Sequence, residues 1–278
     1  MSVAVSPSED ALAAVRVRGG ASAAFKADRA ATRIATLEEH GGYRLKFPDC
    51  AGGAVETVIV NTGGGVAGGD RVGFDITAGA RTNVTVATAT AERIYRSAGA
   101  TAEIDVRLRA DVGATLAWLP QATILFSGSR LQRRFAVDVA GDARFLMAET
   151  TIFGREASGE IMGQGRLHDD WRVRRDGALV FADATRLDGD IAGLLARPAL
   201  AASVRGVALL LCVATDVEEK RDLVRAALAE VAALAGVSAW NGMLVVRVQA
   251  SRLDILQLAL RRAIDALQIG TVPQVWSN

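Results

Sequence analysis

The sequence predicts a mainly β fold (α+β): layered, β-helix-like stacked sheets, with a small C-terminal α+β part that contains two helices. Three observations support this prediction. Apolar and polar residues alternate in short segments between about residues 30 and 190, which is typical of strands with one buried face. Turns containing glycine follow these segments at loosely recurring intervals. After residue 205 the apolar spacing changes to that of amphipathic helices.

The composition argues against several classes of protein. The chain has 278 residues, and 50% of them are apolar, which allows a large core. Its 32 basic and 31 acidic side chains leave a net charge of +1, so we expect no nucleic acid and no membrane as a partner. The apolar run 207–214 is too short to cross a bilayer as a helix, and the first 20 residues do not resemble a secretory signal. Cys50 and Cys212 match no metal or redox motif, so a reduced, cytoplasmic protein is expected.

Residues 1–29 are expected to form a loosely ordered lead-in, because they show no clear period. Residues 30–205 are expected to form one layered β domain, in which alternating segments end in turns. The turns that carry this prediction contain Gly79, Gly113, Gly141 and Gly177. Their separations of 34, 28 and 36 residues are too irregular for a solenoid of fixed repeats. They favour similar hairpins stacked on one another.

Residues 206–278 are expected to form a strand-helix-strand-helix part packed on the β domain. Asp216 is predicted to cap the first helix, whose apolar stripe extends from Leu223 to Leu234. Ser251 followed by Asp254 resembles a capping box for the second helix. The apolar face of that helix consists of Leu253, Leu256, Leu260, Ile264 and Leu267.

The glycine-rich segment "NTGGGVAGGD" (61–70) contains the spacing G-x-G-x-x-G of a dinucleotide-binding loop. Such a loop binds a pyrophosphate because it opens a helix, whose N-terminus attracts the anion. Here the next residues alternate, as in a strand, and Asn83 lies where an acidic residue would be expected. We therefore expect a structural β-corner that binds no nucleotide.

The sequence offers few candidates for catalysis. His168 has Asp169 and Asp170 beside it, but neighbouring strand residues point to opposite faces, which disfavours a metal site. Glu149 and Glu160 are conceivable as the two acids of a β-rich, carboxylate-dependent hydrolase. The alternative is that these acids form ion pairs with Arg155 or Arg144. From the residues alone, a β-rich protein without enzymatic activity is favoured.

Five segments, in order, resemble the family of the urease accessory protein UreD, called UreH in some species. These segments are "NTGGGVAGGDRVGFDI", "TATAERIYRS", "LPQATILFSGSRLQRRFAVDV", "FLMAETTIFGREASGE" and "VPQVW". Together they extend the resemblance over roughly residues 30 to 278. Two departures from the family pattern are Ala89, where glutamine is common, and Gln274, which stands in place of arginine.

The resemblance implies a non-catalytic maturation factor. Members of this family act with UreF and the GTPase UreG on urease apoprotein and deliver nickel to it, so the nickel ion is in transit and no cofactor is held stably. The resemblance also implies a polar internal passage, for which Asp70, Glu149 and Glu160 are the candidate waypoints. Carboxylate oxygens can hold Ni²⁺ loosely enough to release it. The basic rim of the C-terminal helices is the candidate partner surface, with Arg252, Arg261 and Arg262.

Overall fold

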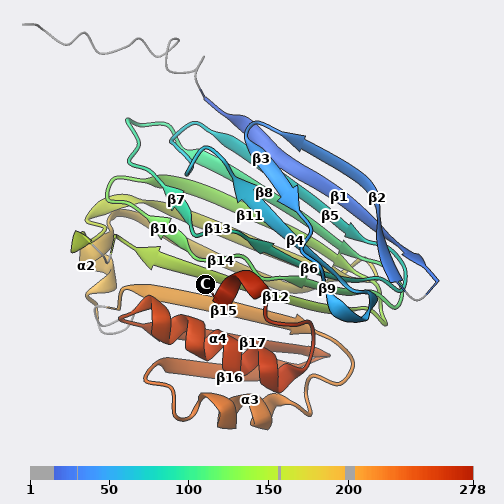
Figure 1. Ribbon diagram of the computed structural model, residues 1–278. Coiled ribbons are helices and arrows are strands. Elements are labelled where there is room, and N and C mark those ends of the chain that lie inside the picture. The colour runs from blue at the N-terminus through green and yellow to red at the C-terminus, as the bar shows by residue number, and fades with distance from the viewer. Residues whose placement is uncertain (1–15, 30, 156–157, 198–203, 278) are drawn as a thin grey trace, which may run out of the picture.

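Two β-sheets lie face to face, and two helices cover the outer side of the second sheet (Figure 1). The structure is a computed structural model, and it describes residues 16–29, 31–155, 158–197 and 204–277. Within these ranges the first sheet has seven strands, in the spatial order β14 (Ala178–Asp190), β13 (Gln164–Arg175), β11 (Arg130–Val139), β8 (Ala102–Ala110), β5 (Arg71–Ala78), β1 (Arg18–Asp28) and β2 (Ala31–His40).

The second sheet has ten strands within the same ranges. Its main path is β16 (Leu234–Trp240), β17 (Met243–Ala250), β15 (Gly206–Val213), β12 (Arg144–Phe153), β9 (Thr115–Trp118), β6 (Asn83–Thr88), β4 (Val55–Asn61) and β3 (Tyr43–Lys46). The short strand β10 (Thr123–Leu125) branches from β12, and β7 (Glu92–Ile94) pairs with β10. The prediction of a mainly β fold is confirmed.

The chain alternates between the two sheets like the coils of a solenoid. Strands β5, β8 and β11 lie side by side and parallel in the first sheet, while β6, β9 and β12 do the same in the second. The turns at Gly79, Gly113 and Gly141 therefore carry the chain from the first sheet to the second. The prediction that they close hairpins was wrong, because alternation fixes which face is buried but not which strand is the neighbour. Only the turn at Gly177, among these four, joins two antiparallel neighbours.

The main core lies between the sheets. Every second residue of the alternating strands points into it, as Val72, Phe74 and Ile76 do on β5, with 8% or less of each residue exposed. On β12 the odd-numbered residues Phe145 and Met147 face this core, whereas the even-numbered Leu146 faces the helices. Any polar side chain at an odd position of β12 therefore lies between the sheets.

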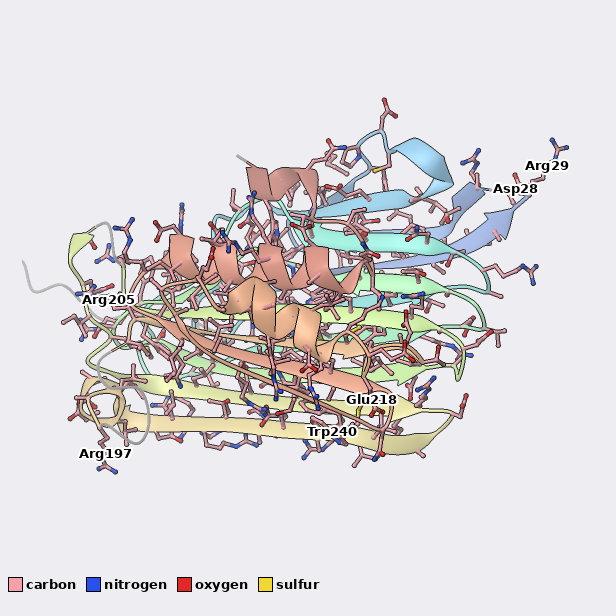
Figure 2. All side chains as sticks on the ribbon, turned by 90° about the horizontal axis from the view of Figure 1, so that it is seen from below. Asp28, Arg29, Arg197, Arg205, Glu218 and Trp240 are labelled. Carbon is pink, nitrogen blue, oxygen red and sulfur yellow. The ribbon has the colours of Figure 1, made fainter. Side chains whose placement is uncertain are left out.

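A second core lies between the second sheet and the helices α3 (Arg221–Leu228) and α4 (Leu253–Leu267). Seen from below, both helices lie across the same face of that sheet (Figure 2). The apolar face predicted for α4 is confirmed for Leu256, Leu260, Ile264 and Leu267, which are 2% exposed or less, whereas Leu253 is half-buried. The first helix is shorter than predicted. It ends at Leu228, and Leu234 starts strand β16 with 72% of its surface exposed.

The C-terminal part is therefore strand, helix, strand, strand, helix rather than strand, helix, strand, helix. The two predicted caps were also wrong. Asp216 pairs with Lys220 at 3.0 Å instead of capping α3. Asp254 forms an ion pair with Arg252 at 2.6 Å, and no side chain caps α4. Oppositely charged side chains close by compete for these carboxylates with the free N–H groups of the first helical turn.

The predicted boundaries differ from the structure at the N-terminal side. Part of the predicted lead-in, Arg18–Asp28, forms strand β1 between β5 and β2, where Ala21, Ala23 and Phe25 pack into the main core. Small residues hid this strand, because alanine and glycine alternate too weakly in hydropathy to reveal a period. Residues 1–15 of the lead-in lie outside the described residues. At the other end, β15 bonds directly to β12, so the segment from residue 206 continues the second sheet.

The remaining elements are short. Helix α2 (Ile191–Leu195) follows β14, and two short 3₁₀ helices are η1 (Ala51–Gly53) and η3 (Gln274–Ser277). Asp190 caps α2 by accepting a hydrogen bond from the Gly193 amide. No helix in the described part of the chain combines the length and apolar character needed to cross a membrane.

Candidate functional site between the two sheets

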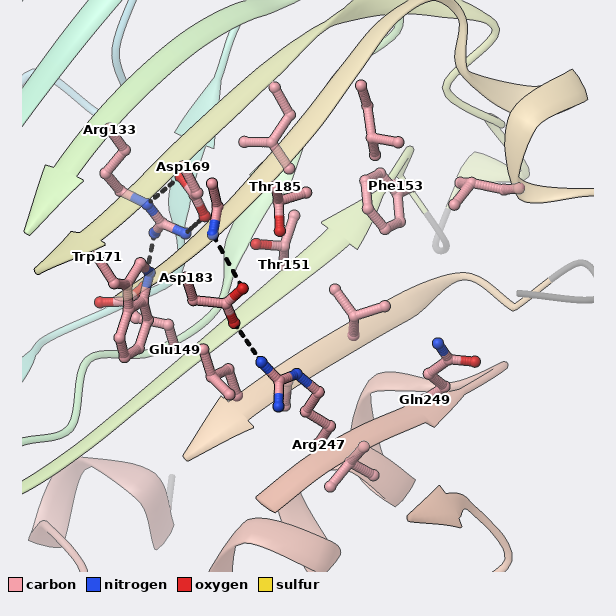
Figure 3. A pocket seen from close by; sticks show the side chains of 18 residues that line it. Arg133, Glu149, Thr151, Phe153, Asp169, Trp171, Asp183, Thr185, Arg247 and Gln249 are labelled. Carbon is pink, nitrogen blue, oxygen red and sulfur yellow. Dashed lines mark hydrogen bonds and ion pairs between the residues drawn. The ribbon is translucent and has the colours of Figure 1, made fainter. Parts of the chain in front are cut away.

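A cavity of about 300 Å³ lies between the sheets (Figure 3). It is near the edge of the first sheet formed by β14 and β13 and near β17 and β15 of the second sheet. Its wall on the first sheet includes Arg133, Asp169 and Asp183. Its wall on the second sheet includes Glu149 and Arg247. Charged side chains from both sheets therefore meet in a space that is otherwise lined largely by apolar residues.

Arg133 forms the centre of the charged group. Its Nη1 donates to Glu149 Oε2 at 2.6 Å, and its Nε and Nη2 donate to the two oxygens of Asp169 at 3.0 and 2.6 Å. The guanidinium also lies 5.1 Å from the centre of the Phe135 ring. Trp118 Nε1 donates to the second oxygen of Glu149 at 2.7 Å. This ion-pair group, Arg133 with Glu149 and Asp169, joins a strand of the second sheet to two strands of the first.

Burial controls the electrostatics of this group. Arg133 is 3% exposed, Glu149 6% and Asp169 8%. Burial raises the pKa of Glu149, and the opposing effects of Arg133 and the Trp118 hydrogen bond do not cancel this. For Arg133 burial acts to lower the pKa, but the charges of Asp169 and Glu149 outweigh it and the pKa is raised. Two carboxylates share one guanidinium, so the group has a formal charge of −1 when all three are ionised.

A second ion pair lies at the more exposed side of the cavity. Arg247 Nη2 contacts Asp183 Oδ2 at 2.5 Å, and Figure 3 shows this contact joining β17 to β14. The Arg247 side chain is 57% exposed, so this pair faces water, unlike the pair formed by Arg133. A cation entering here would meet carboxylates at two depths.

The structure does not bring the three predicted metal-binding carboxylates together. Glu160 lies in a loop beyond β12, where Arg155 binds it at 2.9 Å. Its carbonyl packs against Gly154, which is separated from Glu149 by about 16 Å of extended strand at ~3.3 Å per residue. That is too far for the paired acids of a glycosidase. In the described ranges, no group of three or more His, Cys, Asp or Glu side chains is arranged to hold a metal.

The predicted ion pairs of these acids were half correct. Glu160 does pair with Arg155, although at the surface. Glu149 pairs with Arg133, whereas Arg144 pairs with Asp216. The side chains of His168 and Asp169 point to opposite faces of β13, as expected for neighbouring residues of a strand. His168 bonds Asp188 at 2.5 Å on the outer face of the hairpin, and Asp169 points inward.

Asp70 fastens the glycine-rich corner. It is 5% exposed, and its two oxygens accept hydrogen bonds from the amides of Val17 and Ala67 at 2.9 and 2.7 Å. Strand β5 follows directly at residue 71, so there is no helix N-terminus that could bind a phosphate. Gly65 has a φ of 155°, and a Cβ there would lie 2.5 Å from the Tyr95 ring. This close approach explains the glycine.

A partly buried polar cluster lies beside the same corner. Asn61 Nδ2 donates to both oxygens of Glu92, at 3.0 and 3.2 Å, and to the Gly65 carbonyl at 3.3 Å. The Tyr43 hydroxyl donates to Glu92 at 3.4 Å. Burial raises the pKa of Glu92 to about 7, although the hydrogen bonds from Asn61 and Tyr43 act to lower it. Glu92 therefore titrates near neutral pH.

Sequence reasoning missed Arg133, Asp169 as its partner, Asp183 and Arg247. One signal was available for Arg133. It occupies an inward position in the alternation of β11, between Leu131 and Phe135, where an apolar residue is expected. A charged residue at such a position needs a partner inside the core. Asp183 gave no such signal, because it lies on a strand with mixed exposure. Arg247 did give one, since it follows Met243 and Val245 at the inward positions of the mostly buried strand β17.

The predicted partner residues lie at or in α4. Arg252 is exposed and pairs with Asp254, while Arg262 comes within 3.9 Å of Glu230 on the loop after α3. Arg261 is partly exposed. All three lie outside the cavity between the sheets.

Comparison with known proteins agrees with the sequence motifs. The family model described as "UreD urease accessory protein" matches residues 17–277. The chain is 47% identical over 247 residues to the urease accessory protein UreD of Xanthobacter autotrophicus, covering 89% of this chain and 85% of that one. It is 44% identical to that of Azorhizobium caulinodans, covering 88% and 91%. It is 40% identical to urease accessory protein UreD 3 of a Bradyrhizobium species, covering 98% of both chains. The chain therefore belongs to the UreD family of urease accessory proteins.

Proposed function

We propose that this chain is a non-catalytic scaffold in the maturation of urease. In the cytoplasm it assembles with UreF and the GTPase UreG on urease apoprotein and helps to insert nickel into the active site. The observation that carries this proposal is family membership over residues 17–277, with relatives named as accessory proteins. Nickel is the cargo of such a scaffold and is held only in transit.

We further propose that the cavity between the sheets is part of the route of the nickel ion. The ion-pair group of Arg133 contributes two carboxylates and a formal charge of −1, which attracts a divalent cation. Arg133 competes with the ion for both carboxylates, so binding is weak enough for release. Asp70 and Glu160 are further waypoints at separate places, one at the glycine-rich corner and one in the loop after β12.

The test of the scaffold is co-purification. The chain is co-expressed with UreF, UreG and urease apoprotein, and the complex and the nickel content of urease are measured. We expect a stable complex and an increase in urease nickel that requires this chain. A chain that elutes alone, with urease nickel unchanged by its omission, contradicts the proposal.

The test of the route uses Glu149→Gln and Asp70→Asn, with Glu103→Gln as the control on the outer face of the first sheet. Each amide keeps the shape of the side chain and removes its charge. We expect normal assembly with less nickel in urease for the first two variants and normal nickel for the control. Normal assembly with normal nickel in all three rejects the route. Variants that fail to assemble assign Glu149 or Asp70 to folding alone.

The partner surface is tested by Arg261→Glu with Arg262→Glu in one chain. We propose that these residues bind UreF together with Arg252, and reversal of two charges should weaken that binding at least tenfold. Arg174→Glu, on the exposed face of β13, is the matched control. Equal binding by all three proteins places the UreF surface elsewhere.

A further inference from the structure

A second cavity, of about 680 Å³, lies on the outer side of the second sheet. Its floor is formed by outward side chains of neighbouring strands, including Glu56 on β4 and Thr85 on β6, which are paired in register. Its other side is the segment after α4, from Gln268 to Gln274, which turns back against the sheet (Figure 1). The second cavity therefore lies on one face of the second sheet, and the cavity lined by Glu149 lies on the opposite face.

Glu56 is an incompletely satisfied carboxylate in this cavity. The residue is 4% exposed, and its Oε2 accepts one long hydrogen bond, 3.3 Å, from the backbone amide of Gln274. Its Oε1 has no hydrogen-bond partner within the described part of the chain. A buried carboxylate oxygen without a partner is costly, so a donor that reaches it is bound favourably.

No cationic side chain of the described residues pairs with Glu56. Arg144 lines the same cavity, but it lies three strands away, on β12, which is about 14 Å at ~4.8 Å per strand. It is already paired with Asp216 at 3.2 Å. Gln274 places its side-chain amide on the Asp49 carbonyl at 3.3 Å and brings no charge.

We propose that this cavity binds a guanidinium or ammonium group, which donates hydrogen bonds to the Glu56 carboxylate. The group enters from the side of the cavity that Gln274 lines. The chemistry requires a cation with several N–H donors, because Glu56 supplies a charge and Thr85, Asn83 and Thr115 line the cavity with further polar groups. The group could belong to a small molecule or to an arginine or lysine of a bound protein. The site is independent of nickel delivery.

Agmatine, a small guanidine, is the probe for the site. Its binding to the full chain is measured by titration calorimetry and by the thermal unfolding midpoint. We expect saturable binding that raises the midpoint. In Glu56→Gln, which removes the charge, binding should weaken at least tenfold while the unliganded protein unfolds at the same or a higher temperature. Glu160→Gln is the control, because that carboxylate is already paired at the surface, and it should bind like the wild type.

Gln274→Arg gives a second, independent variant that keeps Glu56. Its guanidinium can fill the cavity from within, so agmatine should bind at least tenfold more weakly and the unliganded protein should be more stable. Absence of agmatine binding to the wild type, or equal binding to wild type and Glu56→Gln, overturns the proposal.

The source of the cation is decided by competition. Agmatine is added to the purified complex of this chain with UreF and UreG. Release of a protein from the complex by agmatine, together with weaker assembly of the Gln274→Arg chain, identifies a side chain of that protein as the occupant. Agmatine binding with the complex intact identifies a small-molecule site. Either result leaves nickel transfer itself untouched, so failure of the nickel proposal is seen separately.

Discussion

At the scale of single residues, Arg133 has the most consequential contacts in the molecule's interior. It comes from the first sheet and holds one carboxylate from each sheet, Asp169 and Glu149. The arrangement makes the guanidinium harder to replace than either acid, because its removal leaves both carboxylates buried and unpaired.

We therefore predict that Arg133→Met destabilises the protein by about 3–5 kcal/mol, whereas Glu149→Gln, which leaves the pair with Asp169, costs about 1–2 kcal/mol. Urea unfolding measures both. Arg134→Met, whose side chain points to solvent from the same strand, is the control and should change stability by less than about 1 kcal/mol. Equal effects of the two arginine substitutions would show that the buried group is not needed for stability.

Glu92 makes stability depend on pH. Its pKa in the folded protein is about 7, above the value of 4.5 for a free side chain. The folded state therefore holds this proton more tightly than the unfolded state, which stabilises the fold below pH 4.5. This contribution is lost as the pH rises through 7, by up to about 3 kcal/mol.

The measurement is urea unfolding at pH 5 and pH 8 for the wild type and Glu92→Gln. We expect the wild type to lose more stability between these values than the variant, since glutamine does not titrate. The same loss in both proteins would assign the pH dependence to other groups.

At the scale of elements, the glycine-rich corner between β4 and β5 depends on close packing. We predict that Gly65→Ala costs about 2–4 kcal/mol, because its φ is 155° and a Cβ would meet the Tyr95 ring at 2.5 Å and the Arg93 carbonyl at 2.8 Å. Gly73→Ala within β5 has open space around the new methyl group and should change stability by less than about 0.5 kcal/mol. Thermal unfolding distinguishes them, and a tolerated Gly65→Ala would mean that the corner can shift.

The elements also show what the sequence could and could not predict. Alternation identified strands such as β5 and β8, and helical spacing identified α4, because burial on one face imposes a period. Strand partners could not be predicted, since period two is the same for a hairpin and for parallel coils. Strand β1 was not predicted, because its inward-facing residues are mainly alanine. Glu149 was found as a candidate, but its partner Arg133 lies 16 positions away on another sheet, and no local pattern joins them.

At the scale of the whole molecule, helices α3 and α4 cover the apolar outer face of the second sheet and keep it from water. Leu210, Cys212, Leu244 and Val246 of that sheet are fully buried, and six residues of α4 are buried on the facing side. Helix α4 is therefore part of the core, although its outer side is exposed.

We predict that deletion of residues 251–278 makes the chain aggregate. The deletion uncovers the apolar outer face of the second sheet, and exposed apolar patches promote association. Size-exclusion chromatography and light scattering of the truncated chain test this. The charge-reversed variant of Arg261 and Arg262 is the control that changes the surface and keeps the core. A monodisperse truncated chain would contradict the prediction.

The order of the strands in the sheets also determines where local opening of the structure is expected. Strands β5, β8 and β11 have a hydrogen-bonded neighbour on both sides, whereas β14 has one only on the side of β13. Amide protons of β14 should therefore exchange with deuterium sooner than those of β8, through local opening rather than global unfolding. Since Asp183 and Thr185 of β14 line the cavity between the sheets, part of its wall belongs to an edge strand. Access to the charged interior can then be gained by loosening one edge, while the central coils stay closed.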